Sequence, residues 1–262
     1  MGKAKGADAN AQSGAYGNAL QAASTRGHDA IARILLEKDA DVNAQSGEYG
    51  SALQAASTEG HEAIVQMLLE RDADVNAQSG EYGNALQAAS ANGHKAIVML
   101  LLAHDADVNA QGGEYGNALQ AASANGHKAI VMLLLAHDAD VNAQDGEYGN
   151  ALQAASAEGY IRITQLLLAH GADVNAQGGE YGNALQAASA EGYIRITQLL
   201  LAHGADVNAQ GGEYGNALQA ASERGHEELV QLLIERGANV NARIGEHSNH
   251  PDIFERHKDN LT

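Results

Sequence analysis

YGNALQAASAEGYIRITQLLLAHGADVNAQGGE, residues 148–180, is followed at once by the same 33 residues at 181–213. The Tyr-Gly pair that opens this stretch returns every 33 residues, and each return starts a unit, at Tyr16, Tyr49, Tyr82, Tyr115, Tyr148, Tyr181 and Tyr214. A fixed period of this length is the sequence signature of a solenoid of stacked repeats. A chain that copies itself this closely leaves little room for one unique catalytic constellation, so we expect a repeated surface instead.

Within one unit, here 82–114, the pattern predicts two helices. Asn84 can cap the first, an alanine-rich helix over 85–90, because its side chain accepts from the unpaired N–H groups of the first turn. Gly93 ends this helix, and a second helix is expected over 94–104. The second helix is apolar over most of its circumference, so neighbouring units must cover it. Small residues let the first helices approach closely, which should place them and the turn tips on the concave side of a curved stack.

Composition argues against several classes of protein. Only 4% of the 262 residues are aromatic, with no Trp and one Phe, so aliphatic side chains must fill the interior. The formal net charge of −18 argues against nucleic acid and anionic membranes as partners. The absence of cysteine excludes disulfides and fits a reducing, cytoplasmic location. We see neither a signal peptide nor an apolar run long enough to cross a bilayer.

These features together resemble the ankyrin repeat. The resemblance rests on the period of 33, the Gly-His that opens the second helix, and the run that ends Gly-Ala-Asp-Val-Asn-Ala at Leu166–Ala176 and Leu199–Ala209. It covers nearly the whole chain and implies an all-α ankyrin solenoid. We assign residues 1–246 to the array, including a partial unit at 1–15, and residues 247–262 to a capping segment or tail.

One departure from the family is systematic. Where the family usually reads Thr-Pro-Leu-His-x-Ala-Ala, this chain reads Asn-Ala-Leu-Gln-Ala-Ala-Ser, as at 84–90. The resemblance implies that Gln87 replaces the inter-unit hydrogen bonding of the family's histidine. This variant looks like the ankyrin arrays of filamentous fungi, including those of intracellular, NACHT/NLR-type immune receptors. An engineered or consensus-derived array, and a structural spacer without specific contacts, remain open alternatives.

A second departure lies at the end of the second helix. Four units have aspartate where the family has glycine: Asp39, Asp72, Asp105 and Asp138. A left-handed backbone is expected at these positions, and it costs a non-glycine residue about 1 kcal/mol. At the C-terminal end of the chain, a short helix is expected over 251–258. We expect Phe254 on this helix to cover the apolar face of the last unit, because terminal units need a lid.

Signals for catalysis or metal binding are weak. Four histidines occupy equivalent positions of successive units: His104, His137, His170 and His203. They should lie about 10 Å apart, one helix-packing distance, which is too far to share a zinc ion with bonds of about 2.1 Å. Histidines after a turn glycine, such as His94, are expected to make local hydrogen bonds that fix the turn. Recurring acids such as Asp107 are expected to be solvated loop acids or turn formers, and not a catalytic pair. We expect no enzyme, metal or cofactor.

Two sets of residues are candidates for partner contacts. Positions that differ between units are not needed for stacking, and the end of the first helix varies visibly. In ankyrin-like arrays this region faces the concave surface, which implies these contacts: Arg26, Glu59, Asn92, Asn125, Glu158, Glu191 and Arg224. Neutral variation at exposed sites is the alternative explanation.

The second set consists of tyrosines near the turn tips, since tyrosine is a favoured interface anchor. These are Tyr49, Tyr82, Tyr115, Tyr148 and Tyr181. The alternative is that each tyrosine packs on its neighbour and makes the tips rigid. An apolar patch would be added if Tyr160, Ile161, Tyr193 and Ile194 are exposed. We therefore expect a monomeric, non-enzymatic scaffold that binds a protein along its concave face.

Overall fold

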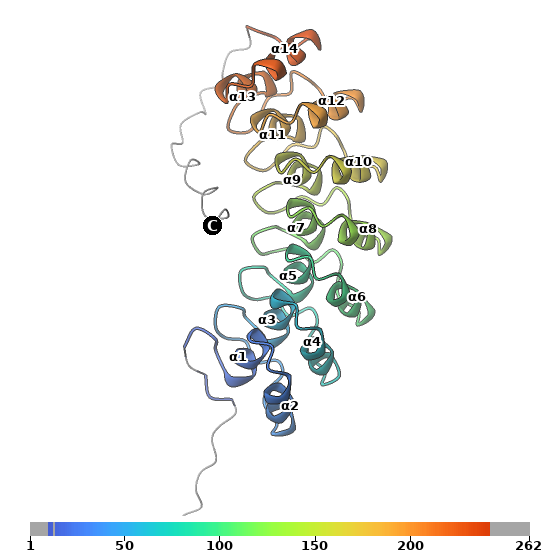
Figure 1. Ribbon diagram of the computed structural model, residues 1–262. Helices are drawn as coiled ribbons and strands as arrows, with labels where there is room; N and C mark the ends of the chain where they lie inside the picture. The colour runs from blue at the N-terminus through green and yellow to red at the C-terminus, as the bar shows by residue number, and fades with distance from the viewer. Residues whose placement is uncertain (1–9, 13, 242–262) are drawn as a thin grey trace, which may run out of the picture.

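The computed structural model describes residues 10–12 and 14–241, which form a curved stack of helix pairs (Figure 1). The first helices of the units are α1 (Ala19–Thr25), α3 (Ala52–Glu59), α5 (Ala85–Ala91), α7 (Ala118–Ala124), α9 (Ala151–Ala157), α11 (Ala184–Ala190) and α13 (Ala217–Glu223). The second helices are α2 (Asp29–Glu37), α4 (Glu62–Leu69), α6 (Lys95–Ala103), α8 (Lys128–Ala136), α10 (Ile161–Ala169), α12 (Ile194–Ala202) and α14 (Glu227–Glu235). The predicted all-helical solenoid is confirmed. The expected contact of Phe254 and the segment 247–262 lie outside the described residues.

The first helix of each unit begins where the sequence predicts. In α5, the Asn84 side chain accepts a hydrogen bond from the Gln87 N–H at 2.9 Å. Gln87 Oε1 accepts one from the Asn84 N–H at 2.9 Å, which completes a capping box. All residues of α5 are buried. This burial is possible because alanine side chains let the first helices of adjacent units pack closely.

The side-chain amide of this glutamine ties each unit to the next. Gln153 is 1% exposed, and its Nε2 lies 3.0 Å from the carbonyl oxygen of Gly178, near the end of its own unit. The same nitrogen lies 3.1 Å from the carbonyl oxygen of Gly182, at the start of the next unit. Gln87 makes the equivalent inter-unit bond to Gly116 at 3.1 Å. The inter-unit hydrogen bonding expected of Gln87 is confirmed.

The second helices supply the larger apolar side chains of the core. In α6, Ile97, Val98 and Leu101 are fully buried, and Leu100 and Leu102 are partly buried against the same cluster. The core therefore runs the length of the stack instead of closing within one unit.

Burial depends on having a neighbour on each side. Leu185 of α11, between two units, is 2% exposed, whereas the equivalent Leu218 of α13, in the last described unit, is only partly buried. At the opposite end, Ile31 and Ile34 of α2 are 49% and 57% exposed. A unit cannot bury its own helix pair, and this is the physical reason for stacking.

The stack bends toward its first helices. Figure 1 shows the second helices along the outer, convex side and the first helices, with the long loops, along the inner side. Adjacent first helices pack more closely against each other than adjacent second helices do. The bulkier second helices hold the units apart on the convex side, so the predicted direction of curvature agrees with the structure.

A second ladder of hydrogen bonds follows an exposed edge of the loops. Asn142 Nδ2 donates to the carbonyl oxygen of Gly171 at 3.2 Å, and its Oδ1 accepts from the Asp173 N–H at 2.8 Å, both in the next unit. Within the loop, the Asp107 carboxylate accepts from the Asn109 N–H at 2.9 Å and forms an Asx turn. Of the two roles expected for the recurring acids, the structure shows turn formation.

The aspartates that replace glycine adopt the left-handed backbone that the sequence predicts. Asp105 has φ 63°, and the equivalent Gly171 has φ 85°. The position follows the C-terminus of a second helix, where the negative end of the helix dipole also disfavours a carboxylate. Two separate effects therefore make aspartate unfavourable here.

We expect Asp105→Gly to raise the free energy of unfolding by about 1 kcal/mol, because it removes the left-handed strain of a non-glycine residue. The reverse change, Gly171→Asp, should lower it by a similar amount. Urea titration with circular dichroism measures both. An unchanged or lowered midpoint for Asp105→Gly would contradict this explanation.

Candidate functional site

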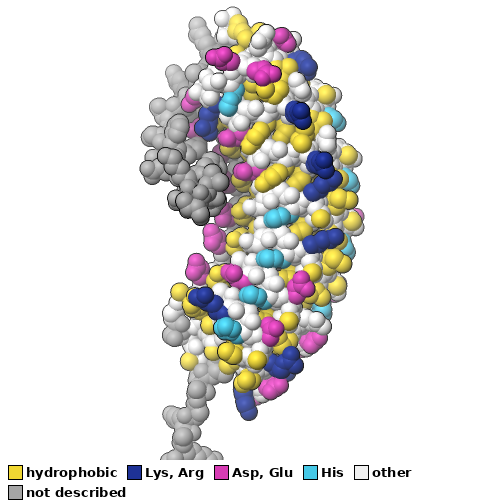
Figure 2. Space-filling model, in the orientation of Figure 1, with side chains coloured by type: hydrophobic (Ala, Val, Ile, Leu, Met, Phe, Trp, Pro, Cys, Tyr) yellow, Lys and Arg dark blue, Asp and Glu magenta, His cyan; other side chains and the backbone are white. Residues whose placement is uncertain are grey.

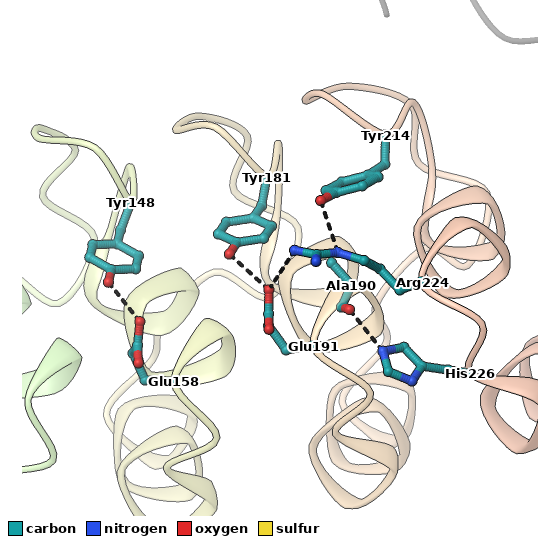
Figure 3. A network of polar contacts seen from close by, with 8 residues as sticks. All are labelled: Tyr148, Glu158, Tyr181, Ala190, Glu191, Tyr214, Arg224 and His226. Carbon is teal, nitrogen blue, oxygen red and sulfur yellow. Dashed lines mark hydrogen bonds and ion pairs between the residues drawn. The ribbon is translucent and has the colours of Figure 1, made fainter. Parts of the chain in front are cut away.

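The tyrosines of the Tyr-Gly pairs are positioned by turn tips that are linked from unit to unit. The Glu180 N–H donates to the carbonyl oxygen of Glu147 in the preceding unit at 3.2 Å. Behind Tyr181, Gly182 has φ 87°, and a Cβ there would lie 2.6 Å from the backbone nitrogen of Gly212. Glycine is therefore required after the tyrosine, and the fixed backbone holds each ring beside the end of the first helix (Figure 3).

Where the residue ten positions later is glutamate or arginine, the tyrosine contacts that side chain, which lies at the end of its own first helix. The Tyr148 hydroxyl donates to the Glu158 carboxylate at 2.7 Å, and the Tyr181 hydroxyl donates to the Glu191 carboxylate at 3.1 Å. The same pairing joins Tyr49 to Glu59 at 2.8 Å. The two predicted sets of contact residues thus form one surface. We call the tyrosines together with their partners at the tenth following position the concave row.

At the ends of the concave row the partner is an arginine. The Arg26 guanidinium lies over the ring of Tyr16, 5.4 Å from its centroid, and donates to the Tyr16 hydroxyl at 2.5 Å. The Arg224 guanidinium lies 5.9 Å from the ring centroid of Tyr214. Arg224 also forms an ion pair with Glu191 of the preceding unit at 3.4 Å. Cation–π and ionic contacts therefore occur side by side (Figure 3).

Neighbouring units are in direct contact along the concave row. The rings of Tyr82 and Tyr115 stack with centroids 6.4 Å apart, and those of Tyr181 and Tyr214 stack with centroids 6.5 Å apart. This stacking agrees with the alternative in which each tyrosine packs on its neighbour. Stacking does not remove the row from a partner, because Tyr16 is 39% exposed and the others are partly exposed.

The electrostatics of the concave row keep the phenols protonated. The hydrogen bond to Glu59 and burial raise the pKa of Tyr49 to about 12. Burial, together with the neighbouring Glu158, raises the pKa of Tyr148 far above its usual range. Burial and the charge of Glu191 likewise raise the pKa of Tyr181 far above its usual range. At neutral pH these hydroxyls are therefore neutral and donate hydrogen bonds to the glutamates.

The two remaining candidates face their own helices. Asn92 Nδ2 donates to the carbonyl oxygen of Ala88 at 2.9 Å, and Asn125 Nδ2 donates to that of Ala121 at 2.9 Å. Asn92 still lines an open pocket of ≈ 260 Å³ between the second and third units. The pocket is a hollow within the concave row and has Tyr49, Glu59 and Tyr82 among its lining residues.

The pairing within the concave row is not among the predictions from the sequence. The tyrosines and the variable residues are predicted there as separate groups, and the first group does not include Tyr16 or Tyr214. The signal was present, because the spacing from Tyr to its partner is ten residues in every unit. Whether these residues contact a partner protein stays a prediction.

The predicted role of the turn histidines is wrong. His94 Nε2 lies 2.9 Å from the carbonyl oxygen of Thr58 in the preceding unit, and His127 Nε2 lies 2.9 Å from that of Ala91. These bonds span 36 residues, so the histidines join units and do not fix their own turn. In two units tyrosine replaces this histidine, and the Tyr160 ring occupies the equivalent space above Gly126.

The apolar patch expected on the second helices is only partly present. Tyr160 and Tyr193 are each 37% exposed, while Ile161 and Ile194 are half-buried. Ile161, Tyr193 and Ile194 line a shallow, open depression on the outer surface.

Two further features bear on possible chemistry. Among residues 10–12 and 14–241, no group of three or more His, Cys, Asp or Glu side chains is arranged to hold a metal ion. No helix in the same described ranges has the length and apolar character required to cross a membrane.

The family model for ankyrin repeats, in three copies, matches residues 3–79, 78–145 and 152–244. The ankyrin repeat domain of human ASB11, known from a crystal structure, is similar with a TM-score of 0.71 and 24% sequence identity. The match covers 82% of this chain and 97% of that one, and it is a likeness of fold. A search of curated proteins gave no match. The chain belongs to the ankyrin repeat family.

Proposed function

We propose that this chain is a non-enzymatic recognition module that binds a protein partner along the concave row. Ankyrin repeats are generally protein–protein interaction modules. The observation that carries the proposal is the pairing of constant with variable residues. The tyrosine is the same in every unit, whereas the residue ten positions later is Arg, Glu or Asn. A constant aromatic anchor beside a variable polar group suits recognition whose specificity differs from unit to unit.

The wider setting is part of the same proposal. The chain acts as a monomer in the cytoplasm, and neither nucleic acid nor membrane is its partner, given the net charge of −18. It is the ligand-sensing part of a fungal immune-type receptor, where near-identical units are exchanged to change specificity. The near identity of neighbouring units supports this role. By contrast, an engineered array or a structural spacer would bind no specific partner.

We expect Glu158→Lys combined with Glu191→Lys to weaken binding of the natural partner at least about tenfold, because both changes reverse charge within the concave row. The partner is first identified by affinity capture and mass spectrometry, then purified and titrated calorimetrically. The stability of the array should fall by no more than about 1 kcal/mol, since both glutamates are partly exposed.

The matched control is Glu70→Lys combined with Glu235→Lys. These glutamates are exposed and lie at the ends of α4 and α14, away from the concave row. Their replacement by lysine changes the net charge by the same amount. If both double variants weaken binding equally, or neither does, the partner does not bind along the concave row.

A further inference from the structure

Arg224 shows how a guanidinium fits between two neighbouring units of the array. At the junction of the sixth and seventh units, its guanidinium lies over the ring of Tyr214, 5.9 Å from the centroid, and its Nη2 lies 3.4 Å from the Glu191 carboxylate of the preceding unit (Figure 3). Its Nε also donates to the Tyr214 hydroxyl at 3.2 Å. A planar guanidinium can stack on a ring and pair with a carboxylate at the same time, which a compact ammonium group does less well.

The pocket between the second and third units is built from the same kinds of residue. Its lining residues have equivalents four units along the chain, at the junction that holds Arg224, and most of them are identical. The pocket therefore lies where the chain itself places a guanidinium four units later. The carboxylates and rings that recur at both junctions are Glu48, Tyr49, Glu59, Glu81 and Tyr82, which correspond to Glu180, Tyr181, Glu191, Glu213 and Tyr214.

The residue at the position of Arg224 decides whether this space is filled. In the third unit it is Asn92, whose Nδ2 donates to the carbonyl oxygen of Ala88 in its own helix at 2.9 Å. Because this side chain is short and turned to its own helix, Glu59 and Tyr82 line an open pocket. No other junction of the array joins a glutamate at this position to an asparagine in the following unit.

The hydrogen bond from Tyr49 leaves Glu59 able to accept a second donor. The Tyr49 hydroxyl donates to the Glu59 carboxylate at 2.8 Å. At the other junction, Glu191 accepts from the Tyr181 hydroxyl at 3.1 Å and from Arg224 at 3.4 Å. A carboxylate has about four lone-pair sites, so a tyrosine and a guanidinium can share it.

The charge and the size of the pocket suit one cationic side chain. Glu48, Glu59 and Glu81 contribute carboxylates, and none of the described residues that line the pocket is Lys, Arg or His. In Figure 2 the acidic side chains gather along the edge formed by the loop tips, while most basic side chains lie over the second helices. The volume of ≈ 260 Å³ is below the range of about 300–1,000 Å³ for sites that hold drug-sized ligands.

We propose that the pocket between the second and third units binds one arginine side chain of the partner protein. The guanidinium lies on the ring of Tyr82 and pairs with Glu59, as Arg224 does with the equivalent residues within the chain. This inference rests on the proposed function and names the chemistry by which the concave row holds its partner.

The probe for this pocket is N-acetyl-arginine methylamide, which carries one guanidinium and no other charge. Titration against the full chain, followed by saturation-transfer NMR at physiological salt, should give saturable binding with a Kd of about 1 mM. The lysine compound should bind about threefold more weakly, because an ammonium group does not stack and pair together. The citrulline compound, which has a similar shape without the charge, should bind at least about tenfold more weakly. Equal binding of either compound, or binding that does not saturate, would overturn the proposal.

An exchange of two residues tests the position of the site. Asn92→Arg places the chain's own guanidinium in the pocket and should weaken binding of the arginine compound at least about tenfold. Adding Arg224→Asn to that variant opens the equivalent pocket between the sixth and seventh units without a change in composition. Binding should then return to within about threefold of the original affinity. The proposal fails if Asn92→Arg binds as the original chain does, or if the exchange does not restore binding.

Gln165→Arg is the control for the added charge. Gln165 is exposed on α10, so this variant changes the net charge as Asn92→Arg does but leaves the pocket intact. It should keep the affinity for the arginine compound within about a factor of two. A loss equal to that of Asn92→Arg would indicate a response to net charge alone and would contradict the proposal. Arginine already stands at the position of Asn92 in the first and seventh units, and circular dichroism of each variant verifies that it is folded.

Failure of this inference differs from failure of the proposed function. A purified natural partner that loses affinity on charge reversal at Glu158 and Glu191, but binds Asn92→Arg as tightly as the original chain, contradicts the inference and leaves the concave row as the binding surface. A partner whose affinity is unaffected by either change contradicts both.

Discussion

Gln153→Leu is expected to lower the free energy of unfolding by about 3 kcal/mol, although leucine is similar in size and the site is fully buried. The substitution removes the donor that reaches Gly178 and Gly182. The Gly182 carbonyl keeps the Gly178 N–H, at 2.9 Å, as a partner. The Gly178 carbonyl loses its bond from the amide. The Gly178 residue is half-buried, and a buried carbonyl without a donor would cost at most about 1–3 kcal/mol; the bond to the next unit is lost as well.

Urea denaturation followed by circular dichroism measures this effect, with Gln165→Leu as the control. Gln165 lies on α10 of the same unit and is exposed, so its replacement should change stability by no more than about 0.5 kcal/mol. Both variants replace one glutamine with leucine, so a difference in stability between them reports only the position of the substitution. Equal urea midpoints for the two variants would mean that the hydrogen bonds from the buried glutamine side chains do not hold the units together.

The helices could be predicted from the sequence because their signals are local. Asn84 and Gly93 lie next to the helix ends that they determine, and the observed α5 extends only one residue beyond the predicted 85–90. The left-handed backbone at Asp105 could be predicted because Gly171 stands at the same position of another unit. In each case the deciding residue and its effect lie within a few positions of each other.

Contacts between units were harder to predict. The hydrogen bond of His94 joins residues 36 apart, and its partner is a backbone carbonyl, which leaves no trace in the pattern of side chains. The pairing of Tyr148 with Glu158 had a signal in its constant spacing, but only the curvature of the loop brings the two together. Gln87 was predicted correctly because the family supplies a hydrogen-bonding residue at the same place.

The concave row combines stability with the proposed recognition. Stacking of Tyr181 on Tyr214 and the backbone bonds between tips hold the surface rigid before a partner arrives. A rigid surface loses little conformational entropy on binding. The side chains that vary, such as Glu158, lie at helix ends where substitution leaves the buried ladders intact. Recognition can therefore change from unit to unit without weakening the stack.

The central claim is that each unit is stabilised by its neighbours, so that the array is modular and its binding surface repeats along it. Deleting residues 181–213 tests this directly, because it recreates the native junction between Glu and Tyr214 and removes one complete unit. We expect a folded array that unfolds cooperatively in urea, with an m-value lower by about one seventh. Its free energy of unfolding should fall by about 2–5 kcal/mol. Loss of the helical circular dichroism signal, or an unchanged m-value, would contradict the account.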